Sequence, residues 1–194
     1  MRDYRPIEVY LDRLALDIYP QPPDDKQLAL TRAVIDDWVA KLPDLDSVLD
    51  VGCGQGHAMP MLSEYAGRVE GVTLGSDFGM CGPKSGLRVR EEDMSFLPYR
   101  RGEFTLIFAR HVLEHSPMPL ITLMEWRRVA SRWLILIVPS LDSFDVRGRN
   151  HYHMLLPGQW EVLLEHAGWD VIWYEDDGFE HRFFCERVKD GPES

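Results

Sequence analysis

The fold is decided by the stretch Val48-Leu-Asp-Val-Gly-Cys-Gly-Gln-Gly56. An apolar strand leads into Gly52, Gly54 and Gly56, and a helical pattern follows them. Glycine accepts the backbone angles of a tight turn and lets a ligand come close to the main chain. In an open α/β sheet, ligands bind at the carboxyl ends of the strands. The stretch therefore predicts a site for a nucleotide-like cofactor at the end of a buried strand.

The spacing of these glycines argues against two common nucleotide sites. Read from Gly52, the dinucleotide fingerprint G-x-G-x-x-G/A needs a small third residue where the chain has His57. The fingerprint also needs an acid about 20 residues further on, close to where the chain has Thr73. No Gly-Lys-Ser/Thr follows the glycines, so a phosphate-binding P-loop is absent too.

Segments with strand and helix patterns alternate along the chain. The strands expected are residues 47–51, 68–73, 87–90, 104–109, 133–138, 169–174 and 183–188. The helices expected are residues 7–16, 25–42, 57–66, 118–130 and 157–168. The segment 133–138 is apolar throughout, as a strand covered on both faces must be. This alternation predicts an α/β fold with a doubly wound, mostly parallel sheet.

Several segments resemble, in order, those of the class I S-adenosylmethionine (SAM)-dependent methyltransferases. They are the glycine motif from Asp50 to Gly56 and the stretches 92–98, 104–108, 109–115 and 153–168. The resemblance implies SAM as cofactor and a Rossmann-like sheet of order 3-2-1-4-5-7-6, with an antiparallel last strand. It also implies one domain over residues 1–194, with a helical lid or cap at 1–45 and a Rossmann-like core at 46–189.

The resemblance assigns the residues of the glycine loop to the cofactor. The backbone of Gly52, Cys53 and Gly54 would pack against the methionine and ribose part of SAM. Asp50 precedes this loop, and its carboxylate would attract the positive amino group.

The remaining predicted SAM contacts follow the next strands. Asp93 would accept the adenine N6 hydrogens, and the Met94 amide would serve adenine N1. The family usually has an acid after its second strand, where this chain has Thr73; Asp77 is an alternative partner for the ribose. The predicted contacts beyond the glycine loop are Thr73, Leu74, Asp93, Met94 and Arg110.

Two histidines follow the fourth strand, where the methyl group should point. His115 is the first candidate for a general base and His111 the second, because an imidazole accepts a proton near neutral pH. If a helical turn forms here, both lie on one face at positions i and i+4. The alternative is that they only pack or cap. The later loop 151–153 (His-Tyr-His) borders the expected acceptor pocket.

The predicted reaction is methyl transfer to an oxygen or nitrogen atom of a small molecule. Arg147 and Arg149 suggest an anionic acceptor, since guanidinium groups pair well with phosphate or carboxylate. The net charge of −11 argues against nucleic acid as a substrate. One alternative is a non-catalytic SAM-fold binding or assembly protein.

A more remote alternative is a zinc hydrolase. The residues His111-Val-Leu-Glu-His115 spell H-x-x-E-H, the inverted zinc-protease motif, and His151 or His153 could add a third ligand. Such a motif needs a sustained helix, which Pro117 and Pro119 limit. If the chain is a methyltransferase, we therefore expect it to bind no metal.

Composition indicates a soluble, cytoplasmic protein. No apolar run reaches the ~18 residues of a membrane span. The three cysteines are widely scattered, so reduced thiols are expected rather than a metal clip. The oligomeric state is not indicated.

Overall fold

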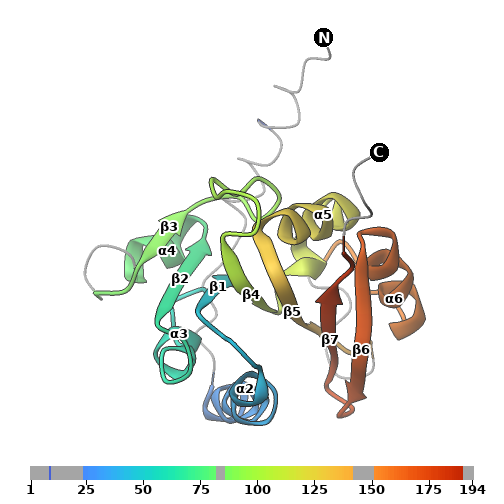
Figure 1. Ribbon diagram of the computed structural model, residues 1–194, viewed down its shortest axis with the longest axis horizontal. Coiled ribbons are helices and arrows are strands. Elements are labelled where there is room, and N and C mark those ends of the chain that lie inside the picture. The colour runs from blue at the N-terminus through green and yellow to red at the C-terminus, as the bar shows by residue number, and fades with distance from the viewer. Residues whose placement is uncertain (1–8, 10–23, 82–85, 142–150, 190–194) are drawn as a thin grey trace.

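The computed structural model describes residue 9 and residues 24–81, 86–141 and 151–189 (Figure 1). Its centre is a seven-stranded sheet of order β3-β2-β1-β4-β5-β7-β6, which confirms the predicted α/β fold and strand order. The strands are β1 (Ser47–Val51), β2 (Arg68–Thr73), β3 (Val89–Glu91), β4 (Phe104–Arg110), β5 (Ala130–Pro139), β6 (Trp169–Asp176) and β7 (Glu180–Arg187). β7 runs antiparallel to both of its neighbours, and the other pairs are parallel.

Helices cover both faces of the sheet. The longer ones are α2 (Asp25–Asp37), α3 (Ala58–Leu62), α4 (Gly75–Cys81), α5 (Pro119–Val129) and α6 (Pro157–His166), and two 3₁₀ turns are η1 (Val39–Lys41) and η2 (Leu113–His115). Asp24 caps the start of α2, since its carboxylate accepts a hydrogen bond from the Gln27 amide at 2.8 Å. The helix has Trp38 as its C-cap and so ends before the stop predicted at Pro43. β3 begins two residues later than expected, and α3 is shorter than the predicted helix 57–66.

Alternation along the strands divides the core into two layers. In β4, Leu106 and Phe108 face the layer that holds Val34 and Ile35 of α2. Ile107 and Ala109 face the opposite layer, which contains the buried tryptophans of α5 and α6, Trp126 and Trp160. A strand with apolar side chains on both faces fits only between two such layers.

About half of the predicted lid, residues 1–45, lies outside the described residues. Residues 1–8 and 10–23 are not described, and neither is most of the helix expected at 7–16. Residues 25–37 form α2, which packs on the sheet as part of the core.

Two further observations concern the described part of the chain. Cys53, Cys81 and Cys185 are buried thiols that form no disulfide with one another. No helix in this part is long and apolar enough to cross a membrane.

Candidate active site

The predicted cofactor contacts gather at one edge of the sheet. β1 pairs in parallel with β2 and β4, and β2 pairs in parallel with β3, so the carboxyl ends of these four strands meet. Leu74 directly follows β2, and Asp93 and Met94 follow β3 closely. This edge is where open α/β sheets bind their ligands.

The glycine loop forms a tight turn at the end of β1. Gly52, Gly54 and Gly56 all have positive φ, at 71°, 52° and 80°. The amides of Gly52 and Cys53 donate to the Val72 carbonyl at 2.9 and 3.0 Å, which fixes the loop against β2. A Cβ on Gly52 would lie 2.4 Å from Val112 Cγ2. The loop therefore lies directly against the segment that follows β4.

Asp50 presents a buried carboxylate beside this loop. The residue is 3% exposed, and its Oδ2 has no hydrogen-bond partner. Burial raises the pKa of Asp50 to about 7. A buried carboxyl group without a donor is unfavourable unless a ligand supplies one. Asp50 thus fits the positive amino group of SAM.

Gly54 leaves room for a ligand, and Asp77 borders that room. Among the described residues, the position of a Gly54 Cβ has one neighbour within 4 Å, the Asp77 Oδ2 at 3.7 Å. Burial raises the pKa of Asp77, against the lowering effect of its hydrogen bond with Gln55. Asp77 therefore reaches the glycine loop from α4, while Thr73 is a buried hydroxyl at the end of β2.

The predicted adenine contacts also have structural partners. Asp93 Oδ1 accepts the Ser95 amide at 2.6 Å, so this carboxylate does cap a turn. Its second oxygen is still available to accept hydrogen bonds. Met94 is held by its carbonyl, which accepts the Trp126 indole N–H at 2.9 Å.

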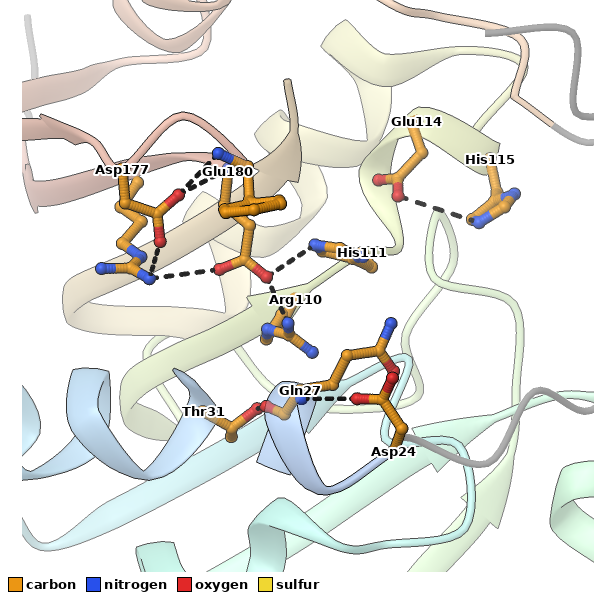
Figure 2. A network of polar contacts seen from close by, with 11 residues as sticks. Asp24, Gln27, Thr31, Arg110, His111, Glu114, His115, Asp177 and Glu180 are labelled. Atoms are coloured by element: carbon orange, nitrogen blue, oxygen red, sulfur yellow. Dashed lines mark hydrogen bonds and ion pairs between the residues drawn. The ribbon is translucent and has the colours of Figure 1, made fainter. Parts of the chain in front are cut away.

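A buried network of charged side chains links the end of β4 to β7 at this edge of the sheet (Figure 2). Glu180, which is 1% exposed, pairs with Arg110 and lies 3.0 Å from His111 Nε2. Burial alone would raise the pKa of Glu180, but His111 and Arg110 outweigh burial and lower it to about 2. Burial and the charge of Arg110 lower the pKa of His111, although Glu180 opposes them. Arg182 approaches Glu180 at 3.5 Å and pairs with Asp177.

The two histidines after β4 do not share a helical face, so that prediction is wrong. His111 has a left-handed backbone with φ of 53°, and its amide donates to the Ile137 carbonyl at 2.9 Å, as in a continued sheet. Only Leu113–His115 then form a 3₁₀ turn. His111 faces Glu180, whereas His115 lies 3.9 Å from Glu114 (Figure 2). The ring centroid of His115 is 5.0 Å from that of His151. The helix required by the zinc-protease motif is absent here.

Sequence reasoning missed Glu180 and only partly identified His151. Glu180 is 70 residues from Arg110 along the chain, and only the β5–β7 pairing brings it to this edge. His151 was one of three residues in a loop expected near the acceptor. Arg147 and Arg149 lie outside the described residues.

Comparisons with known proteins agree with this site. Residues 49–135 match the family model described as "Methyltransferase domain". No curated protein matches the chain.

Solved structures of similar fold cover most of the chain. A SAM-dependent methyltransferase from Aquifex aeolicus is 22% identical with a TM-score of 0.69, over 85% of this chain and 94% of that one. Geranyl diphosphate C-methyltransferase from Streptomyces coelicolor, solved with Mg²⁺, geranyl diphosphate and S-adenosyl-L-homocysteine (SAH), is 15% identical with a TM-score of 0.70, over 84% and 81%. A methyltransferase in complex with the Haloferax volcanii Trm112 activator is 14% identical with a TM-score of 0.68, over 87% and 97%.

The family match covers the glycine loop, the Asp93 turn and β4, which are the parts that meet at the cofactor edge. Residues 49–135 match the model of the methyltransferase domain family, and the described chain has the fold of solved SAM-dependent methyltransferases.

Proposed function

We propose that the chain transfers a methyl group from SAM to an oxygen or nitrogen atom of a small-molecule acceptor. The observation that carries this proposal is the polar segment after β4, which lies against the glycine loop through Val112. Its polar members are His111, Glu114 and His115, and Arg110 is the last residue of β4 before it. Imidazole and carboxylate groups suit an acceptor that loses a proton as it gains the methyl group.

The glycine loop and Asp50 hold the donor in this proposal. SAM supplies an activated methyl group, so the protein contributes chiefly alignment, worth up to ~7–11 kcal/mol. Asp50 attracts the amino group, and Gly54 leaves space for the methionine and ribose part beside the Cys53 backbone, while Gly52 lets the loop pack against Val112.

The outer contacts complete the proposed cofactor site. Asp93 and the Met94 amide take the adenine, and Thr73 and Leu74 border the ribose. Arg110 stays in the set because its buried Nε has no hydrogen-bond partner among the described residues, although its Nη2 pairs with Glu180.

The general-base role of His115 stays a prediction. Its side chain is 28% exposed and follows β4, so an acceptor can reach it. His111 is less suited, because its Nε2 already faces Glu180. If His115 removes the acceptor proton, His115→Ala lowers kcat by about 10²–10⁴-fold and leaves SAH affinity unchanged.

We also propose an anionic acceptor rather than nucleic acid. The net charge of −11 repels a polyphosphate chain. The Streptomyces relative of similar fold was solved with a diphosphate ester, geranyl diphosphate. That relative methylates carbon, so the atom that receives the methyl group must be measured.

The test is transfer of isotope-labelled methyl from SAM into fractions of a cell extract. We expect a labelled, anionic small molecule whose methyl group lies on oxygen or nitrogen, as determined by NMR. The Gly54→Val variant is the inactive control. A carbon-bound label would refute the O/N assignment. SAM binding without transfer into any fraction would favour the non-catalytic alternative.

A further inference from the structure

Three side chains beyond the predicted SAM contacts converge beside η2. They are Glu114, His115 and His151, and one ligand atom from each lies within 4.8 Å of the others. The His115 Nε2 is 3.9 Å from the Glu114 carboxylate, and the two imidazole rings meet edge to face with centroids 5.0 Å apart. Two imidazoles and one carboxylate thus face a common point.

The main chain holds this cluster together. The amides of Tyr152 and His153 both donate to the Glu114 carbonyl, at 2.9 and 3.2 Å. The segment that carries His151 is therefore fixed to the same residue that supplies the carboxylate. The proximity of His151 to η2 is a built feature of the backbone and does not depend on side-chain rotation alone.

The Glu114 carboxylate is buried without a hydrogen bond. The residue is 1% exposed, and within the part of the chain that the structure describes neither Oε1 nor Oε2 has a hydrogen-bond partner. A buried carboxylate is unfavourable unless it is paired or coordinates a metal. The guanidinium of Arg110 is committed to Glu180. A bound cation would supply the missing partner.

We propose that Glu114, His115 and His151 bind a divalent transition-metal ion. Imidazole ligands suit Zn²⁺, Fe²⁺, Co²⁺ and Ni²⁺, whereas Mg²⁺ prefers oxygen ligands. Ligand atoms at ~2.0–2.2 Å from one ion lie roughly 3–3.6 Å from one another, so the three ligand atoms need to move about 1 Å closer together, which side-chain rotation allows. The set shares Glu114 and His115 with the H-x-x-E-H motif but replaces His111, which faces Glu180.

Three protein ligands leave a coordination position for a substrate. This part of the inference rests on the proposed transfer to oxygen or nitrogen and replaces the base role predicted for His115: the ion would polarise the acceptor hydroxyl or amine, and His115 would be a ligand. The acceptor loses its proton to solvent, its oxygen or nitrogen bonds to the methyl carbon, and the bond from that carbon to sulfur breaks.

The binding test uses the full chain, stripped of metal by a chelator and titrated with Co²⁺. We expect one ion per chain and a visible absorption band, with Zn²⁺ displacing Co²⁺ and Mg²⁺ failing to do so. His115→Ala and His151→Ala should each weaken Co²⁺ binding by more than about tenfold, as should Glu114→Gln. His153→Ala is the matched control, because it keeps the amide bond to Glu114 and lies outside the cluster. It should bind Co²⁺ as the unmodified chain does.

SAH binding and circular dichroism of each variant show whether it is folded. The metal site is refuted if the folded chain binds no stoichiometric Co²⁺, or if His115→Ala and His151→Ala bind it unchanged. Equal competition by Mg²⁺ would refute the transition-metal assignment. The binding measurement contains no acceptor, so it separates the two proposals: metal binding without any methyl transfer leaves the site standing and overturns the proposed function. Methyl transfer that is indifferent to metal removal overturns the catalytic role of the ion.

Discussion

We predict that Asp50→Asn stabilises the cofactor-free protein above neutral pH and weakens its binding of SAM. Burial raises the pKa of Asp50 from 3.8 to about 7. Because the folded-state pKa is the higher one, this group's contribution to stability is fully present below about pH 4 and falls as the pH rises to about 7. At 1.36 kcal/mol per pKa unit, ionised Asp50 costs the folded protein roughly 4 kcal/mol at about pH 8. Between about pH 5 and about pH 8 this cost grows by roughly 2–3 kcal/mol.

Urea denaturation followed by tryptophan fluorescence measures this effect, and the chain has 6 tryptophans. The unfolding free energies of Asp50→Asn and of the unmodified chain should diverge by roughly 2–3 kcal/mol over that pH range. The variant should also bind SAH about 10–100-fold more weakly, since it loses a charge-assisted contact with the ligand's amino group. Saturating SAH should reduce the divergence, because that amino group pairs with Asp50 only in the unmodified chain. Stability differences that stay constant with pH would refute the argument from burial.

Three other variants, one of them with a matched control, test neighbouring parts of the site. In urea denaturation, Gly52→Ala should lose about 2–4 kcal/mol of unfolding free energy, since its Cβ would lie 2.4 Å from Val112. Its control is Gly178→Ala, where φ is also positive at 81° but no described atom lies within 4 Å of the new Cβ. This control should lose only about 1–2 kcal/mol. Equal losses would contradict the predicted clash. Gly54→Val should abolish SAH binding in calorimetry while unfolding stays cooperative, because its side chain enters the space left for the ligand; retained affinity would remove the cofactor assignment. Glu180→Gln should lose roughly 3 kcal/mol of unfolding free energy at neutral pH, because the folded-state pKa of about 2 lies below the ordinary 4.5. This difference from the unmodified chain should shrink as the pH falls from about 5 toward 2. A difference that does not change with pH in acid titrations would contradict the network.

Most of the fold was predictable because its signals are local. The segments at 47–51 and 68–73 match β1 and β2, and the apolar segment 133–138 lies within β5. The short strand β3 was displaced by two residues, since its side chains are half-buried or exposed and carry a weak hydrophobic pattern. The strand order came from the family resemblance, because hydrophobic alternation says which faces of a strand are buried and not which strand lies next to it.

The site was predictable in part, and for the same reason. Glycines before a helix are a local signal, so the cofactor loop was found directly. The histidines after β4 were found as residue types, but their partners were not. His111 pairs with Glu180, which is contributed by β7, and His115 meets His151 only because two amides fix the later segment on Glu114.

The residues predicted to hold SAM came from the family resemblance and stay a prediction, whereas the sequence by itself determined the strand–glycine–helix loop and the alternation of strands and helices. These depend on backbone angles and on burial patterns within about ten residues of one another. Only the tertiary structure decided that Asp50 and Glu114 are buried without donors, and that His111 and His115 face different partners. The burial of a side chain and the ion pairs it forms depend on which distant segments the sheet brings together. The free-energy cost of a buried charge is therefore set by its surroundings in space and not by its neighbours in the sequence.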